Sequence, residues 1–163
     1  DIVVNNAGTA RDNLLAMMPD EDWDSVLQTN LGGTYHVCKE VVRHMIFQRS
    51  GRIVNMASLS GVTGLAAQTN YAAAKGGVIA FTKALALELA RYEILVNSVA
   101  PGLVETDITD KMPEAKRKRM IEQIPLGRMG RPEEVAQLVL FLASGMNTYI
   151  TGQNFVISGG LYT

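Results

Sequence analysis

Four short apolar runs, rich in β-branched residues, recur along this chain, and each is separated from the next by enough residues for a helix. The runs occupy residues 2–4 (IVV), 52–58 (RIVNMAS), 93–101 (EILVNSVAP) and 153–160 (QNFVISGG). Strands this apolar are typical of a parallel sheet that is covered on both faces, and helical crossovers are the usual links between parallel neighbours. The pattern therefore predicts an α/β fold in which helices cover a parallel sheet.

The segments between these runs carry helix signals. The expected helices cover residues from 20 to near 50, about 70–92, 113–123 and 131–144. Pro19 and Asp20 begin the first, whose apolar residues are spaced by threes and fours, and Gly51 is expected as its left-handed cap. The second is apolar nearly all round, which predicts burial on more than one side.

Composition and charge exclude several classes of protein. The 163 residues are 47% apolar and 19% charged, which fits a single globular domain over residues 1–163 without an internal linker. A net charge of -1 gives no reason to expect nucleic acid or a membrane surface as partner, and no window approaches the roughly 18 apolar residues that span a bilayer. The one cysteine, Cys38, suits a reducing compartment, so we expect a cytoplasmic protein.

The segment QTNYAAAKGG places Tyr71 and Lys75 four residues apart, on one face of the second helix. An ammonium group beside a phenol favours the phenolate and lowers its pKa, which would give a proton donor and acceptor near neutral pH. The alanines between them leave room for a large ligand. Gly76 and Gly77 are unfavourable inside a helix, so they predict the close approach of another element, such as a helix of a neighbouring subunit.

Two other polar positions support a site here. Ser58 and Ser60 follow a strand, where sites gather in such sheets, and either hydroxyl could hold a substrate carbonyl. Asn30 lies on the apolar stripe of the first helix and precedes Gly32 and Gly33. It either marks a local distortion that frees backbone groups to bind water, or is a polar core residue satisfied by its own helix.

The ordered set of motifs resembles the short-chain dehydrogenase/reductase family over the whole chain. The set comprises NNAG after a strand, an asparagine in the next helix, a serine thirteen residues before the tyrosine of Y-x-x-x-K, and PG after a strand. Within the family, segments such as RDNLLAMM and IPLGRMGRPEEVA are most similar to β-ketoacyl-[acyl-carrier-protein] reductases. The resemblance implies a Rossmann-type doubly wound sheet, present here from its fourth strand onward.

The resemblance also implies a role for each candidate residue. Tyr71 would protonate a carbonyl oxygen, Lys75 would hold the nicotinamide ribose and lower the Tyr71 pKa, and Ser58 rather than Ser60 would orient the carbonyl. Asn30 would hold a water in a proton relay that reaches Lys75. No metal is implied. The cofactor, NADPH in preference to NADH, would lie against Tyr71, Lys75 and the residues Asn6, Ala7, Gly8, Pro101, Gly102, Val104 and Thr106.

One part of the family pattern is absent from these residues. The glycine-rich loop that holds the cofactor pyrophosphate does not occur, and no G-x-G-x-x-G stands anywhere in the chain. The residues that choose between NADH and NADPH are absent with it. We therefore expect that the first βαβαβ part of the fold is missing from the 163 residues, which alone would bind cofactor or fold poorly.

The resemblance implies two kinds of partner. Residues 111–131 carry a local excess of basic side chains that would attract an acidic acyl carrier protein, unless they form only a solvated helix face. Arg49 fits a carrier contact of the family, whereas Tyr92 replaces an arginine at a second one. The helices at 21–49 and 71–92 match those that form the family's homotetramer.

The function that the resemblance implies is NADPH-dependent reduction of 3-oxoacyl-[acyl-carrier-protein] to the 3-hydroxyacyl form in fatty-acid synthesis. Two alternatives remain open. One keeps the mechanism and changes the substrate to an acyl-CoA, a sugar, a steroid or another alcohol. The other is a non-catalytic oligomer subunit that lacks the cofactor half.

Overall fold

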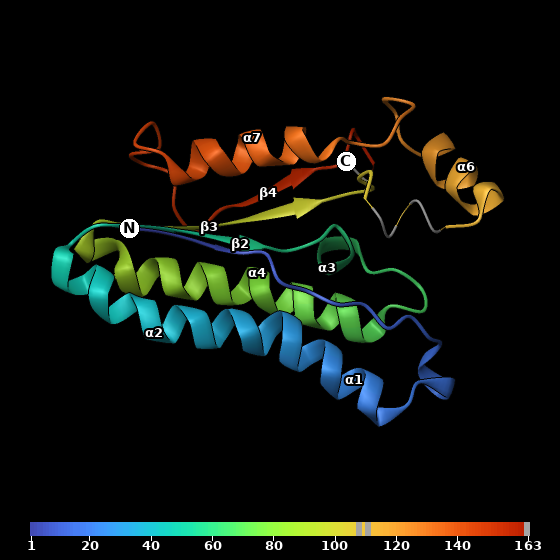
Figure 1. Ribbon diagram of the computed structural model, residues 1–163, viewed down its shortest axis with the longest axis horizontal. Helices are drawn as coiled ribbons and strands as arrows, with labels where there is room; N and C mark the ends of the chain where they lie inside the picture. Colours follow the sequence, from blue (N-terminus) through green and yellow to red (C-terminus); the bar gives the residue numbers. More distant parts are fainter. Residues whose placement is uncertain (107–108, 110–111, 162–163) are drawn as a thin grey trace.

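The chain forms one four-stranded parallel sheet with helices on both faces (Figure 1). A computed structural model describes residues 1–106, 109 and 112–161. The strands lie in the order in which they occur along the chain, as β1 Ile2–Asn5, β2 Gly51–Met56, β3 Ile94–Pro101 and β4 Asn154–Ile157. All three strand pairs are parallel, so the carboxyl ends of the four strands meet at one edge. The predicted α/β fold is confirmed.

The register of the strands places one apolar row against the two long helices. Val3 pairs with Ile53, and Ile53 pairs with Val96. This row packs into a core with helix residues that include Cys38, Met45, Leu85 and Leu89. Burial raises the pKa of the Cys38 thiol to about 11, as expected for an inert core cysteine.

The first predicted helix is built in three parts. Its elements are α1 Asp20–Leu27, a π-helical turn η2 Gln28–Gly32 and α2 Gly33–Gln48. The turn contains Asn30, so the predicted local distortion is present there. The predicted cap at Gly51 is wrong: Arg49 takes the left-handed conformation at φ 52°, and Gly51 begins β2. Gly51 is needed for packing instead, because an added Cβ would lie 2.6 Å from the Met45 sulfur.

The second long helix, α4 Thr69–Leu89, ends in a 3-10 turn, η3 Ala90–Tyr92. Its two glycines do meet close neighbours, but both neighbours belong to the same chain. An added Cβ at Gly76 would lie 3.3 Å from the carbonyl oxygen of Gly61, in the short helix α3 Ser60–Thr63. One at Gly77 would lie 2.8 Å from a methyl group of Leu31. The glycines are thus explained without a neighbouring subunit.

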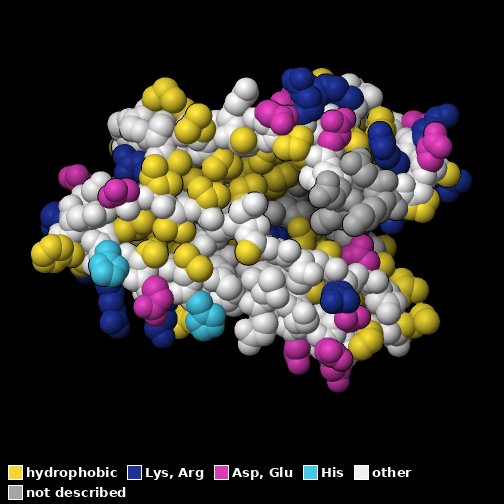
Figure 2. All heavy atoms as spheres, in the orientation of Figure 1, with side chains coloured by type: hydrophobic (Ala, Val, Ile, Leu, Met, Phe, Trp, Pro, Cys, Tyr) yellow, Lys and Arg dark blue, Asp and Glu magenta, His cyan; other side chains and the backbone are white. Residues whose placement is uncertain are grey.

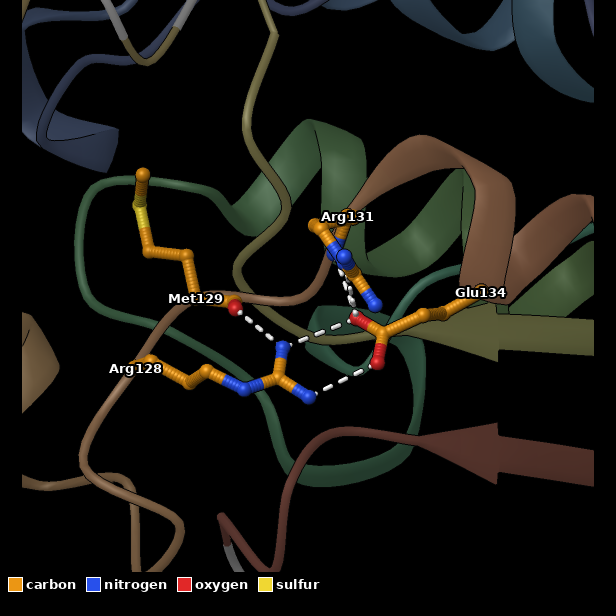
Figure 3. A network of polar contacts seen from close by, with 4 residues as sticks. All are labelled: Arg128, Met129, Arg131 and Glu134. Carbon is orange, nitrogen blue, oxygen red and sulfur yellow. Dashed lines mark hydrogen bonds and ion pairs between the residues drawn. The ribbon is translucent and has the colours of Figure 1, made fainter.

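The remaining helices are α6 Glu114–Glu122 and α7 Pro132–Ala143. Helix α7 covers β2 and β3 on the face opposite α2 and α4 (Figure 1). Its first turn is fixed by Glu134, which accepts the backbone N–H of Arg131 at 2.7 Å and the guanidinium of Arg128 at 2.7 and 2.8 Å (Figure 3). These contacts lower the pKa of Glu134 to about 2. None of the helices that the structure describes is long and apolar enough to cross a membrane.

Strand β1 is not buried as its sequence predicts. Ile2 is 55% exposed and Val4 is 42% exposed, although α7 covers β2 and β3. Figure 2 shows apolar side chains gathered in a band beneath α7 along this side of the molecule. The apolar character of the strand therefore exceeds what the helices of this chain cover.

A chain of polar side chains crosses the core between β1, β2 and α4. Asn5 donates from Nδ2 to Asn55 Oδ1 at 2.8 Å, and Asn55 donates from Nδ2 to the Thr82 hydroxyl at 2.9 Å. Thr82 in turn donates to the carbonyl oxygen of Val78. Asn55 and Thr82 are fully buried, so each polar group depends on these partners.

Candidate active site

Apart from Asn30, which lies in η2, the predicted site residues lie at the carboxyl edge of the sheet, at the ends of three strands and on α4. Asn6, Ala7 and Gly8 follow β1, and Ser58 follows β2 by two residues. The segment from Gly102 to Thr106 follows β3, which ends at Pro101. Tyr71 and Lys75 lie in the first two turns of α4. Because parallel strands share one carboxyl edge, residues from distant parts of the sequence meet there.

The two serines of the segment ASLSG have different contacts. Ser58 lies close enough to the Tyr71 hydroxyl to lower its pKa, and Ser58 Oγ accepts the backbone N–H of Ser60 at 3.2 Å. The Ser60 hydroxyl instead donates to Gln68 Oε1 at 2.8 Å. The geometry therefore places Ser58, and not Ser60, beside the phenol.

The environment of Tyr71 raises its pKa. Burial is the largest cause, the nearby Ser58 side chain acts in the opposite direction, and the charge of Asp12 raises the pKa further. The direction predicted from the Tyr71–Lys75 spacing is wrong for this arrangement, because desolvation of the phenolate dominates. Tyr71 is consequently neutral at physiological pH, in the form that can donate a proton.

Lys75 is buried, with 4% of its surface exposed, and points toward β2. Its Nζ donates to the carbonyl oxygen of Met56 at 2.8 Å and lies 5.7 Å from the centre of the Tyr71 ring. Burial disfavours the ammonium and lowers the pKa of Lys75 from 10.5 to about 8. A group with this pKa can exchange protons close to neutral pH.

Replacing Lys75 with methionine should stabilise the protein at neutral pH. Holding a charged Lys75 costs about 3 kcal/mol below pH 8, because 2.5 pKa units separate its folded pKa from the ordinary value. The variant loses one hydrogen bond, worth about 1 kcal/mol, so a net gain of about 2 kcal/mol is expected. The unfolded lysine retains its proton up to pH 10.5, so the gain should shrink as pH rises from 8 toward that value. Urea unfolding at several pH values measures it, and a destabilised variant at pH 7 would contradict the prediction.

Asn30 is held both by its own helix and by the loop after β1. Its Nδ2 donates to the carbonyl oxygens of Val26 and Thr9, both at 2.8 Å, and its own backbone carbonyl accepts the Thr34 hydroxyl. The backbone oxygen is therefore occupied from within the helix. The Oδ1 atom, in contrast, is buried and has no hydrogen-bond partner among the described residues. An added Cβ at Gly8 would lie 2.7 Å from this oxygen and 3.6 Å from Lys75 Nζ, so the three residues surround one small space.

The loop after β3 also approaches its neighbours closely. An added Cβ at Gly102 would lie 3.0 Å from Ser158 after β4. Val104 forms a bridge with Gly130, and the backbone N–H of Thr106 donates to the Thr109 hydroxyl. Small residues beside an unpaired buried oxygen fit a large polar ligand across this edge of the sheet. Within the residues described, no group of three or more His, Cys, Asp or Glu side chains could hold a metal.

Three residues near the site were not singled out from the sequence. Asn70 is fully buried, donates to the carbonyl oxygen of Arg11 at 2.9 Å and accepts the backbone N–H of Tyr71 at 2.7 Å. Gln68 donates to Asp12 Oδ2 at 2.9 Å. Of these three residues, only Asn70 could have been noticed from the sequence, because it is a polar residue directly before Tyr71. The contact between Gln68 and Asp12 spans 56 residues and leaves no pattern in the sequence.

Comparisons with known proteins show the family of the chain. A family model described as enoyl-(acyl carrier protein) reductase matches residues 1–162. Curated 3-oxoacyl-[acyl-carrier-protein] reductases are 55% identical in Thermotoga maritima, 53% in Chlamydia pneumoniae and 52% in Pseudomonas aeruginosa. Each match covers 99% of this chain and 65% of the relative, so the chain spans about 65% of the length of these relatives. The chain belongs to the short-chain dehydrogenase/reductase family.

Proposed function

We propose that this chain is the catalytic part of an NADPH-dependent reductase that converts 3-oxoacyl thioesters on acyl carrier protein to 3-hydroxyacyl thioesters. One observation carries the proposal. A neutral Tyr71 lies beside Ser58 and a buried Lys75, at the edge of the sheet where three loops converge. This arrangement suits protonation of a carbonyl oxygen.

Each residue has a task in this proposal. Ser58 donates a hydrogen bond to the substrate carbonyl and fixes its orientation. Tyr71 gives its phenolic proton to the carbonyl oxygen as the carbon becomes tetrahedral. Lys75 returns a proton to Tyr71, and the unpaired Oδ1 of Asn30 orients the water that supplies Lys75. A nicotinamide cofactor, when bound, supplies the hydride.

The cofactor would be held by the three loops at the carboxyl edge. Lys75 would bond the nicotinamide ribose; in support, its Nζ and Asn30 Oδ1 border the same space beside Gly8. The proposed contacts are those predicted from the family resemblance: Asn6, Ala7, Gly8, Pro101, Gly102, Val104 and Thr106. Asn6, Ala7 and Gly8 are exposed, and therefore free to contact a ligand.

The choice of substrate rests on the relatives. The proteins about 50% identical to this chain are named for 3-oxoacyl groups on acyl carrier protein, whereas the broader family model is named for an enoyl group. A Ser–Tyr pair that polarises and protonates an oxygen suits a ketone better than a carbon–carbon double bond. We therefore propose the keto substrate.

Helix α6 supports the proposed carrier protein as partner. Lys116, Lys118 and Arg119 are exposed, and none of them forms an ion pair with any residue that the structure describes. Lys111, which the sequence adds to this basic segment, lies outside the described residues. A helix with free cations beside the site would attract an acidic carrier. A homotetramer through α2 and α4 also remains a proposal, for which exposed Tyr35, Val37 and Leu87 provide apolar surface.

Oxidation of NADPH by the native protein that contains residues 1–163 tests the proposal. Acetoacetyl groups are offered on acyl carrier protein, on coenzyme A and on a small thiol, together with a sugar and a steroid ketone. We expect all three thioesters to be reduced, with kcat/KM highest for the carrier-bound form. Added salt should lower kcat/KM for the carrier-bound form more than for the small thioester.

Other results discriminate the alternatives. Reduction of the sugar or steroid alone would remove the carrier-protein substrate and keep the catalytic residues. Loss of activity toward every ketone, in a protein that binds NADPH, would favour the non-catalytic subunit.

A further inference from the structure

A line of three polar side chains joins the loops after β1 and β2 beside the proposed site. The Ser60 hydroxyl donates to Gln68 Oε1 at 2.8 Å, and Gln68 Nε2 donates to Asp12 Oδ2 at 2.9 Å. Gln68 directly precedes α4 and stands three residues before Tyr71. We name this line, Ser60–Gln68–Asp12, the amide bridge.

The amide bridge requires the chemistry of a glutamine. A hydroxyl proton needs an acceptor on one side, and a carboxylate needs a donor on the other. The amide group provides both, with its oxygen toward Ser60 and its nitrogen toward Asp12. A glutamate of the same shape could accept from Ser60, but at neutral pH it would place a second negative charge against Asp12.

Further contacts attach the same loop to the start of α4. Ala67 has a left-handed backbone, at φ 67°, and its carbonyl oxygen accepts the backbone N–H of Asn13 at 2.8 Å. Asn70 donates to the carbonyl oxygen of Arg11 at 2.9 Å. A non-glycine residue held at positive φ costs about 1 kcal/mol or more, which indicates that the surrounding contacts determine this conformation.

The amide bridge also reaches Ser58. The backbone N–H of Ser60 donates to Ser58 Oγ at 3.2 Å, while the Ser60 side chain donates to Gln68. Ser60 therefore connects the serine that contacts Tyr71 to the residue that precedes the Tyr71 helix. A shift of Gln68 would move both sides of the Ser58–Tyr71 pair.

We propose that Gln68 is a positioning residue, which through Ser60 and Asp12 holds Ser58 at its productive distance from Tyr71. The inference rests on the proposed function, since a productive distance has meaning only for that reaction. The inference gives Ser60 and Asp12 a shared task, which is to hold Gln68 in place. Asp12 contacts no reacting atom; it holds Gln68, and its charge also raises the pKa of Tyr71.

General support of the fold is a weaker explanation of the bridge. The turn after β2 is already held by the backbone N–H of Leu59, which donates to Pro101 O at 2.9 Å, and by Gly61, which packs on the backbone of Lys75. The bridge is also partly exposed, so its contribution to unfolding should be small. Loss of the amide bridge should therefore change the geometry of the site clearly, while it changes the melting temperature little.

The test compares Gln68→Glu, Asp12→Asn and the double variant in the native protein that contains residues 1–163. Gln68→Glu should lower kcat for the acetoacetyl thioester about 30-fold, because small misplacements of reacting groups have effects of this size. It should also speed hydrogen exchange at the Ser60 amide.

In the double variant the new amide at position 12 can donate to the new carboxylate at position 68. Both hydrogen bonds are then restored, so we expect recovery to within about threefold of the starting kcat. Asp12→Asn alone retains an acceptor for Gln68 and should lose less than Gln68→Glu.

A matched control is Gln153→Glu. Gln153 is exposed and precedes β4, at the opposite edge of the sheet from the site, so the same change in charge should leave kcat and exchange unaltered. Unchanged kcat and Ser60 exchange in Gln68→Glu would overturn the inference, as would a double variant no better than Gln68→Glu. An unsubstituted protein that reduces no ketone would instead overturn the proposed function, and the exchange data would still report whether the bridge forms.

Discussion

Tyr71→Phe should abolish nearly all ketone reduction while leaving the fold intact. The substitution removes only the phenolic oxygen, whose partner is Ser58, and keeps the ring beside Lys75. Because the phenol is the proposed proton donor, kcat should fall about 1,000-fold, within the range that general acid catalysis contributes. Steady-state kinetics with an acetoacetyl thioester measure the effect, and KM should change little.

Tyr149→Phe provides the matched control for this experiment. Tyr149 is 96% exposed and lies in the turn between α7 and β4, so loss of its hydroxyl should leave kcat unchanged. A Tyr71→Phe protein that kept kcat within about threefold of the starting protein would show that another group supplies the proton.

Gly61→Ala should both unfold part of the protein and remove activity. An added Cβ would lie 2.6 Å from the Lys75 carbonyl carbon and 2.7 Å from the Gly76 nitrogen. These are backbone atoms that cannot rotate away, so α3 must move off α4. We expect a loss of about 3 kcal/mol in the free energy of unfolding, at the upper end for overpacking by one methyl group. Activity should fall as well, because α3 carries Ser60 and adjoins Ser58.

The control for Gly61→Ala is Gly145→Ala. Apart from Gly145 itself and its two chain neighbours, no described residue lies within 4 Å of a Cβ added at Gly145, so the same methyl group should change stability by less than about 0.5 kcal/mol. Urea unfolding of the two variants compares them directly. Equal stability would mean that α3 is not seated on α4 as described.

Local sequence patterns predicted the elements of this fold because the signals are themselves local. Apolar β-branched runs predicted all four strands, and the proline at position 132 correctly marked the start of α7. The distortion around Asn30 was also predictable, since a buried amide and two following glycines disfavour a regular helix. Parallel order then followed from the helical crossovers between the strands.

Features that depend on distant contacts could not be predicted in this way. Gly76 and Gly77 signalled close approach, yet whether the neighbour belonged to the same chain depended on where α3 and Leu31 come to lie. The pKa of Tyr71 depends on burial by the assembled loops, which outweighs its spacing from Lys75. The roles of the site residues remain predictions that the kinetic experiments above will test.

The buried chain from Asn5 through Asn55 to Thr82 has a consequence for how the sheet aligns as it forms. A slip of β1 by two residues would keep its apolar side chains on the same face, so the hydrophobic pattern alone opposes that error weakly. The slip would, however, separate Asn5 from Asn55 and leave the buried Oδ1 of Asn55 without its partner, at a cost of about 1–3 kcal/mol. The asparagine pair therefore favours the observed alignment of β1 with β2 over a slipped pairing that apolar side chains alone would tolerate.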